Sequence, residues 1–249
     1  MSDLIIKLKG VMPSEQVCLK IGEECGGKVV LAFSCGKDSI ASWLQLRRLG
    51  IQVVPYYCYL VPGLKFIEDS LNYYEDFFQT KIHRLVSDAL PRMLTDFVYQ
   101  PPHNVGIIRA SGIRKWKKNE FHDVVVKWQG MEEKGMIGVG VRACDSARRR
   151  LSFVMTGPIN RNKRTFYPVW DWTAEKIRTE LYKAKVRVPI DYWLFGRTFD
   201  GIDYRFVEPV SRHFPEDYER IKAMFPFVEM EILRRNSIMK GNTPCQTQP

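Results

Sequence analysis

The sequence predicts an α/β fold, an open and mainly parallel twisted sheet with helices on both faces. The first observation is a set of continuous apolar runs, such as Val-Val-Leu-Ala-Phe at 29–33, which are typical of strands buried in a parallel sheet. The second is that segments with helical spacing of apolar residues separate these runs. The resulting β-α-β-α-β order implies right-handed crossovers that cover both faces of the sheet.

The first part of the chain contains the most regular elements. Ser14 is expected to cap a helix that Gly26-Gly27 ends. In order, the pattern predicts a helix over 14–24, a strand over 28–34, a helix that ends near residue 50, a strand over 52–60, a helix over 71–78 and a strand over 81–86.

Beyond residue 88 the pattern is less regular. It predicts a helix over 88–99, a loop over 100–104, a helix capped by Ser111 that carries Trp116 and Trp128, strands over 136–143 and 165–169, and a helix after Thr173. Pro215 and Pro226 each suit the first turn of a helix. The polar tail over 236–249 is expected to be mobile.

The charge of the chain is strongly basic. The 249 residues carry a formal net charge of +10, which an anionic partner (nucleotide or nucleic acid) and a diffuse solubilising surface explain equally well. No apolar run approaches the roughly 20 residues of a membrane span. The start of the chain is too short and too interrupted by charge for a signal peptide. We therefore expect a cytoplasmic protein without a membrane partner.

Six cysteines, at positions 18, 25, 35, 58, 144 and 245, are scattered along the chain. Neither a C-x-x-C pair nor a His/Cys pair has the spacing of a zinc site. We expect reduced thiols, most of them small core residues, and assign no metal ligands from local sequence. Ligands gathered from distant segments stay open.

The loop Ser34-Cys35-Gly36-Lys37-Asp38-Ser39 lies between a predicted strand and a predicted helix. The N–H groups and the dipole of a helix N-terminus bind anions, glycine lets the backbone approach a ligand, and lysine supplies a mobile cation. A Walker A loop is excluded because Leu31 stands where its first glycine belongs and Asp38 where its Ser/Thr belongs. The dinucleotide G-x-G-x-x-G pattern is absent as well.

The same six residues resemble the PP-loop, S-G-G-x-D-S, of the ATP pyrophosphatase superfamily, with Cys35 in place of the first glycine. The resemblance implies that the loop, Ser34 to Ser39, binds the phosphates of an adenine nucleotide. The structural alternative is an ordinary strand–turn–helix junction, in which Asp38 and Ser39 only cap the helix.

A second block, Gly-Val-Arg-Ala-Cys-Asp-Ser-Ala-Arg-Arg over 140–149, resembles the G-x-R-x-x-[ED]-S-x-x-R block of the phosphoadenosine phosphosulfate (PAPS) reductase branch. Arg142 and Arg149 offer planar donors to phosphate or sulfate, whereas Asp145 can orient an arginine or hold a metal. Ser146 completes the block. A solvated basic helix start is the structural alternative. The segment 167–173 is similar to the P-I-x-x-W-T segment of this branch, and we expect its tryptophans, Trp170 and Trp172, to be structural.

The resemblance breaks at the C-terminus. PAPS reductases share a Glu-Cys-Gly-x-His segment whose cysteine attacks the substrate, and this chain has only Cys245 in Asn-Thr-Pro-Cys-Gln. Nothing near Cys245 would stabilise a thiolate. Cys35, at a helix N-terminus, is the other candidate thiol.

The resemblance implies an adenine nucleotide alpha hydrolase-like domain over 1–210, followed by C-terminal helices and a tail over 211–249. It also implies an enzyme that binds ATP or a PAPS-like adenine nucleotide and adenylates an acceptor with release of pyrophosphate. Lys37, Asp38, Arg142 and Asp145 are the catalytic candidates; the loop residues 34–39 with Arg142, Ser146 and Arg149 are the nucleotide-binding candidates, and Mg²⁺ is expected with the phosphates.

Three points stay open in the sequence. The acceptor is a nucleic acid or another anionic or small molecule, and a homo-oligomer is an open alternative to a monomer. Sulfonucleotide reduction with thioredoxin is the second functional hypothesis. A nucleotide-binding module without catalysis is the third.

Overall fold

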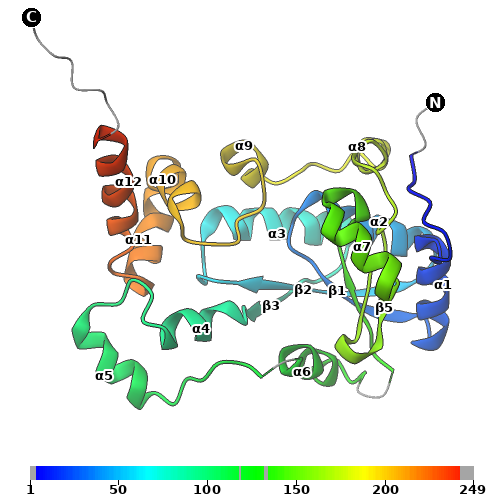
Figure 1. Cartoon of the computed structure of the whole chain (residues 1–249), viewed down its shortest axis with the longest axis horizontal. Coiled ribbons are helices and arrows are strands. Elements are labelled where there is room, and N and C mark those ends of the chain that lie inside the picture. The colour runs from blue at the N-terminus through cyan, green and yellow to red at the C-terminus, as the bar shows by residue number, and fades with distance from the viewer. Residues whose placement is uncertain (1–3, 118, 132–133, 242–249) are drawn as a thin grey trace, which may run out of the picture. The chain divides into compact units, whose positions relative to one another are not determined.

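The computed structural model describes residues 4–117, 119–131 and 134–241. Its central feature is a sheet of six strands in the order β3-β2-β1-β4-β6-β5 (Figure 1). The strands are β1 (Lys28–Ala32), β2 (Gln52–Tyr59), β3 (His83–Val86), β4 (Ile137–Val139), β5 (Ile159–Asn160) and β6 (Thr165–Phe166). β1 pairs in parallel with β2 and β4, and β4 pairs in parallel with β6, whereas β5 and β6 are antiparallel. The predicted open, mainly parallel α/β fold is thereby confirmed.

Twelve α-helices precede, connect or follow the strands in the described residues. They are α1 (Ser14–Glu24), α2 (Lys37–Arg48), α3 (Lys65–Phe78), α4 (Ala89–Thr95), α5 (Pro102–Ala110), α6 (Glu120–Trp128), α7 (Ala147–Thr156), α8 (Ala174–Lys183), α9 (Asp191–Phe195), α10 (Tyr204–His213), α11 (Pro215–Met224) and α12 (Glu229–Gly241). Two 3₁₀ turns, η1 (Ala143–Asp145) and η2 (Arg161–Lys163), complete the set of described elements.

The chain folds into two compact units. The sheet unit comprises residues 1–58, 71–85 and 116–189 and holds nearly the whole sheet. The helical unit comprises residues 59–70, 86–115 and 190–249. Both units are discontinuous in sequence. The division into a domain over 1–210 and additions over 211–249 stays a prediction.

Side chains of β1 are buried alternately on the two faces of the sheet, because successive side chains of a strand point in opposite directions. On one face Val30 belongs to a buried cluster with Tyr56, Ile137 and the α6 residues Val125 and Val126. Figure 1 shows α2 and α6 on opposite sides of the strands. The sheet is therefore covered by helices on both faces, as the predicted right-handed crossover connections imply.

On the other face Phe33, which follows β1, anchors an aromatic cluster. Its ring centroid lies 5.1 Å from that of Trp43 in α2 and 5.2 Å from that of Tyr74 in α3, both edge to face. Phe33 is 1% exposed. Such pairs add to the free energy gained by burying the rings. The cluster thus fixes α2 against the strand that precedes the loop 34–39.

The helical unit is built around Phe66 of α3. Its ring packs against Phe199 at 5.5 Å and against Phe214 at 5.1 Å between centroids. The carboxylate of Asp217, 1% exposed, accepts hydrogen bonds from the backbone N–H groups of Lys65 (2.7 Å) and Phe66 (3.1 Å). A carboxylate from α11 thereby satisfies the start of α3, whose N–H groups have no partner within the helix.

Several predicted boundaries are wrong. Pro13 rather than Ser14 is the N-cap of α1, and the Ser14 N–H donates to Asp171 Oδ2 at 2.9 Å. Residues 100–104 are not all loop, because α5 begins at Pro102. Ser111 ends α5 instead of starting a helix, and the next helix, α6, begins only at Glu120.

The C-terminal elements are partly as predicted. Pro215 is in the first turn of α11, as expected, but α12 begins at Glu229, after Pro226. Asn236 lies within α12, which runs to Gly241, and the rest of the predicted mobile tail, with Cys245, lies outside the described residues. In the part of the chain that the structure describes, no helix combines the length and the apolar character needed to cross a bilayer.

We expect Phe33→Ala to lower the free energy of unfolding by about 3–5 kcal/mol, since truncation leaves a cavity between α2, α3 and the sheet. Phe33→Leu retains most of the volume and should cost about 1.5 kcal/mol. Urea denaturation of both variants measures the difference. Equal losses for the two substitutions would contradict the role assigned to the ring.

Candidate functional site

Two loops meet at the carboxyl edge of the sheet. The first follows β1 and leads into α2, which begins at Lys37 with Gly36 as its N-cap. The second follows β4 and leads through η1 into α7. β1 and β4 are parallel neighbours, with Ala32 in register with Val139. Their loops therefore leave the sheet side by side, in the region where open α/β sheets bind ligands.

The first loop leaves the start of α2 without a side-chain cap. Gly36 has no side chain, so it makes no side-chain cap hydrogen bond to the helix, and its own N–H donates to Ser34 Oγ at 3.4 Å. The two serines turn toward the loop itself: Ser39 Oγ donates to the Gly36 carbonyl at 2.8 Å and lies 3.3 Å from Ser34 Oγ. The backbone N–H groups of a helix start attract an anion. The structural alternative, in which Asp38 or Ser39 caps the helix, is not what the loop does.

Cys35 occupies a left-handed backbone conformation, with φ of 58°. Glycine adopts this conformation without cost, whereas an L residue pays about 1–2 kcal/mol. The first glycine of the PP-loop pattern falls at this position. The conformation therefore gives a physical reason for that glycine, and Cys35 fills the place at some cost. Its side chain is 2% exposed.

An ion-pair network joins the two loops. Arg142 Nε lies 2.7 Å from Asp38 Oδ1, and Arg142 Nη2 lies 2.8 Å from Asp145 Oδ1. Asp145 Oδ2 in turn lies 2.6 Å from Arg149 Nη1, and Lys37 Nζ lies 2.9 Å from Asp38 Oδ2. Four residues predicted as catalytic and one predicted to bind nucleotide thus form one continuous cluster.

Within this cluster the guanidinium of Arg142 is only partly satisfied. Arg142 is 4% exposed, and its Nη1 has no hydrogen-bond partner among the described residues. Nε approaches Asp38 closely, although its angle is too poor for a hydrogen bond. A buried donor without a partner is costly, so such an atom points to a missing acceptor.

The backbone of the second loop approaches α2 closely at Gly140. A Cβ built on Gly140 would lie 2.8 Å from the carbonyl carbon of Asp38 and 2.8 Å from the amide nitrogen of Ser39. Both are backbone atoms and cannot move aside cheaply. The absence of a side chain at this position lets the second loop reach the first. The sequence pattern contained this glycine, but nothing local to it indicated the contact.

The remaining predicted residues have structural roles in this arrangement. Ser146 is the N-cap of α7, and its Oγ accepts a hydrogen bond from the Arg149 N–H at 3.1 Å. Trp170 is 1% exposed, and its Nε1 donates to the Met12 carbonyl at 3.0 Å, which agrees with the structural role expected of it. Whether Ser146 also contacts a nucleotide stays a prediction.

The carboxylates of the site pair with basic side chains. Asp145, which sequence reasoning allowed either to orient an arginine or to hold a metal, binds two arginines. Asp38 is bound by Arg142 and Lys37. No group of three or more His, Cys, Asp or Glu side chains suited to a metal occurs among the residues that the structure describes.

Comparison with known proteins gives two distant likenesses. No family model matches the chain, and no curated protein matches it. The U34-tRNA thiolase NcsA from Methanococcus maripaludis, with its 4Fe-4S cluster, is 10% identical with a TM-score of 0.43, over 92% of this chain and 88% of that chain. The NH3-dependent NAD synthetase from Campylobacter jejuni, in complex with nitrate, is 11% identical with a TM-score of 0.45, over 94% and 97%.

We expect Gly140→Ala to lower the free energy of unfolding by about 1–3 kcal/mol, because the added methyl group meets the backbone of α2. Gly106→Ala is the matched control: it lies in α5, and its Cβ would have nothing within 4 Å. That control should be neutral or stabilising by up to about 1 kcal/mol. Urea denaturation compares them, and similar losses in both variants would contradict the close approach at Gly140.

Substitutions at Cys35 distinguish the contribution of its backbone conformation from the contribution of its thiol. Cys35→Gly should stay within about 1 kcal/mol of the parent stability, whereas Cys35→Val should cost about 2 kcal/mol or more, since a β-branched residue is strained at positive φ. Cys35→Ala keeps a Cβ and removes the thiol. If the Gly and Ala variants retain nucleotide binding, Cys35 contributes only its backbone conformation. If both lose nucleotide binding, the sulfur has a role in it. Thermal unfolding with and without ATP measures both effects.

Proposed function

We propose that the chain is a PP-loop enzyme, similar to the PAPS reductase branch, which binds ATP or a related adenine nucleotide at the loop 34–39 and adenylates an acceptor. The observation that carries this proposal is that a helix start without a side-chain cap adjoins a buried guanidinium nitrogen without a hydrogen-bond partner. The N-terminus of α2 has no side-chain cap, and the buried Nη1 of Arg142 in the adjoining loop has no partner among the described residues. Phosphate oxygens would satisfy both.

The cations around the loop differ in mobility, and this suggests different roles. Lys37 has a flexible side chain that is 36% exposed and pairs with Asp38 Oδ2, so it can follow a phosphate. Arg149, 48% exposed, stands at the rim. Arg142 is buried and held in place, so it would act as a fixed donor to the nucleotide.

The proposed chemistry is nucleophilic attack on the α-phosphorus. An acceptor oxygen forms a bond to the α-phosphorus, the bond to the bridging oxygen of the β-phosphate breaks, and pyrophosphate leaves with the electron pair. The acceptor's proton passes to solvent. Negative charge grows on the leaving pyrophosphate, and the α2 N-terminus with Lys37 would stabilise it. The dipole of the α2 N-terminus is already fixed in place, and it lowers the barrier because it needs no reorganisation.

Mg²⁺ enters this proposal only as the counterion of the nucleotide. Both carboxylates near the loop, Asp38 and Asp145, are bound by Arg142, so neither is a ready ligand for the ion. Mg²⁺ commonly binds the phosphates of its substrate with few protein ligands.

Three of the described thiols do not favour the reductase alternative. Burial raises the pKa of Cys18 to about 12, and burial also raises the pKa values of Cys25 and Cys144. A nucleophilic cysteine needs the opposite shift, because the thiolate is the reactive form. Cys245, the candidate of the sequence analysis, lies outside the described residues.

Thermal unfolding with ATP, PAPS, APS and AMP, each with and without Mg²⁺, tests the proposal, since a ligand that binds the native state raises its stability by mass action. We expect ATP to give the largest shift and Lys37→Ala to weaken its binding at least about tenfold. Lys183→Ala is the control, because Lys183 also pairs with a nearby carboxylate, Glu180, but lies on α8. Parent-like ATP binding in Lys37→Ala would refute the assigned role. A preference for PAPS, with sulfite as product and loss of activity in Cys245→Ser, would establish the reductase alternative.

A further inference from the structure

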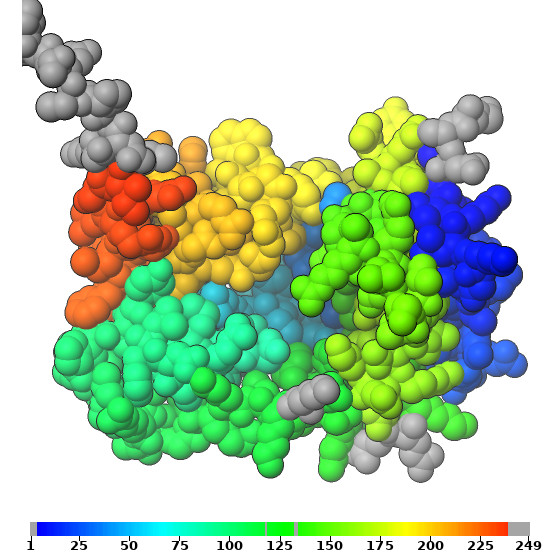
Figure 2. Space-filling view, in the orientation of Figure 1, coloured from blue at the N-terminus to red at the C-terminus, as the bar shows by residue number. Residues whose placement is uncertain are grey.

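Helix α7 turns large apolar side chains toward solvent. Leu151 is 61% exposed, Val154 52% and Met155 74%. These residues stand at positions i, i+3 and i+4, so their side chains share one face of the helix. Figure 2 shows α7, in bright green, at the surface of the face in view. An apolar stripe with this spacing normally packs on a core, and here it has no cover.

Two arginines border this apolar stripe, one on each side. Arg148 stands three residues before Leu151, and Arg150 stands four residues before Val154, so each is a neighbour of the stripe on the helix surface. Both arginines are exposed, and in the described ranges neither forms an ion pair. We call Leu151, Val154 and Met155, together with Arg148 and Arg150, the α7 stripe.

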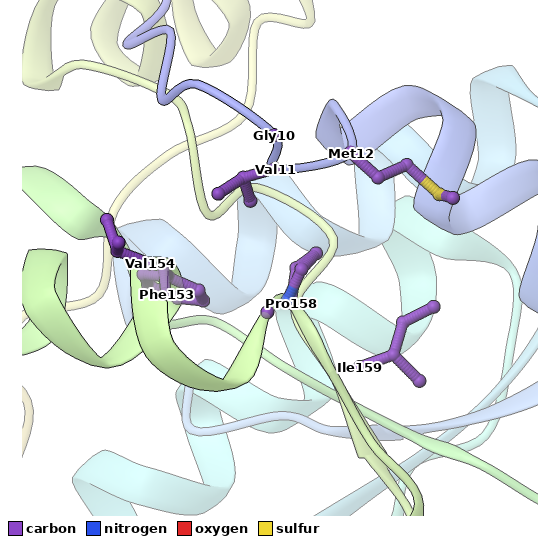
Figure 3. Close-up of a pocket in the computed structure, with 8 residues that line it drawn as sticks. Gly10, Val11, Met12, Phe153, Val154, Pro158 and Ile159 are labelled. Carbon is purple, nitrogen blue, oxygen red and sulfur yellow. The ribbon is translucent and has the colours of Figure 1, made fainter.

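The apolar surface continues from α7 into a pocket. Val154 lines a pocket of about 290 Å³ together with Val11, Met12 and Ile159, and every residue that lines it is apolar or glycine. Figure 3 shows this pocket between α7 and the segment that carries Val11. That segment is fixed beside α7, because Val11 packs on a buried cluster that contains Phe153. The α7 stripe therefore adjoins a hollow that can receive an apolar side chain of a partner.

An apolar stripe between two cations is the surface that one helix offers to another in a helix pair. In such pairs the apolar side chains interlock, and the charged residues beside them pair with opposite charges and select the partner. Apolar surface with a polar rim is typical of protein–protein contacts. Here the rim is Arg148 and Arg150, and α7 contains no acidic residue. The complementary surface therefore has apolar residues bordered by Asp or Glu.

The net charge of the surrounding unit favours the same kind of partner. The sheet unit carries 25 Lys and Arg residues against 15 Asp and Glu residues, whereas the helical unit carries 13 of each. The whole excess of +10 therefore belongs to the unit that contains α7. A positive field of this kind attracts an acidic partner and speeds its association.

Three other occupants fit the α7 stripe less well. In a two-fold contact between copies of this chain the same surface meets itself, and the arginines of both copies would approach with no carboxylate on α7 between them. The segment 242–249, outside the described residues, has neither an acidic nor a large apolar side chain. A lipid surface favours Trp or Phe beside the cations, and the stripe has neither.

We propose that the α7 stripe is a docking site for a partner protein whose docking segment is an acidic amphipathic helix. The apolar residues of that helix pack on Leu151, Val154 and Met155, and its Asp and Glu side chains pair with Arg148 and Arg150. Exposed ion pairs contribute little affinity, so the apolar contacts supply most of it and the charges select the partner. A surface of this small size predicts a reversible, micromolar complex. The inference goes beyond the proposed function and does not depend on it.

The test uses three fluorescein-labelled synthetic peptides of roughly 18 residues, which is long enough to form a helix. The acidic peptide has Leu at positions i, i+3, i+4 and i+7 with Glu on both sides of this row. The basic peptide has Lys in place of every Glu, and the scrambled peptide has the acidic composition without the helical spacing. Fluorescence anisotropy measures their binding to the full chain. We expect the basic and scrambled peptides to bind at least about tenfold more weakly than the acidic peptide.

One pair of variants tests the apolar contacts. Leu151→Ser should weaken binding of the acidic peptide about fivefold or more, because it removes the apolar residue at the centre of the stripe. Leu19→Ser is the matched control, since Leu19 is also a leucine exposed on a helix, 49% on α1. That control should change the affinity less than about twofold.

A second pair of variants tests the charges. Arg148→Glu/Arg150→Glu should weaken binding of the acidic peptide about tenfold and make the basic peptide the tighter ligand. Lys20→Glu/Lys127→Glu reverses the same charge at exposed positions of α1 and α6 and should keep the preference of the parent. Thermal unfolding of all four variants should give midpoints close to that of the parent, since every substituted position is exposed.

The inference would be overturned if the acidic peptide failed to bind at up to about 1 mM of the chain. Equal effects of Leu151→Ser and Leu19→Ser, or of the two charge reversals, would place the binding away from the α7 stripe. Two further measurements identify the other occupants. Binding to vesicles of phosphatidylcholine and phosphatidylserine that Leu151→Ser abolishes would assign the stripe to a membrane. A dimer in sedimentation velocity that Leu151→Ser dissociates would assign it to a second copy of the chain.

Discussion

The arrangement of the candidate site depends on one buried guanidinium. Arg142 is held between Asp38 of the α2 start and Asp145 of η1, and it belongs to neither loop alone. Removing either carboxylate would leave a buried charge without its partner, which costs several kcal/mol. The two loops are therefore tied in one relative position before any ligand arrives. A loop held in this way is preorganised, so a ligand that bound it would spend no binding energy on ordering it.

Two backbone features make that position possible. Gly140 lets the second loop contact the amide of Ser39, and the left-handed turn at Cys35 directs the chain from β1 into α2. Both carry a cost, because a glycine is entropically expensive to order and a cysteine at positive φ is strained. Strain of this kind persists where the surroundings fix it and gathers at functional sites. The aromatic packing of Phe33 behind the loop supplies that fixed surrounding.

Local patterns in the sequence predicted what is local in the structure. The apolar run before residue 34 and the glycine within the loop sufficed to predict β1, α2 and the loop between them. The predicted helix after Ser111 failed because Gly112, with φ of 72°, ends α5 there, and the apolar spacing of Ile113 and Trp116 then imitates a helix. Local patterns could not predict the pairing of Arg142 with Asp38, because the two residues are far apart in sequence and meet only where β1 and β4 pair. The helical unit is assembled from three separate segments of the chain, so local patterns carry no signal for it either.

The structure shows where in the folded chain the net positive charge lies, which the composition alone does not. In the sequence, +10 was compatible with an anionic partner and with a solubilising surface alike. In the folded chain the excess belongs to the sheet unit, and its α7 portion adjoins the same arginine network that organises the loop. A positive charge spread evenly over the protein would have made the helical unit basic as well. The asymmetry therefore places the net basic charge of the protein in the unit that holds the candidate site.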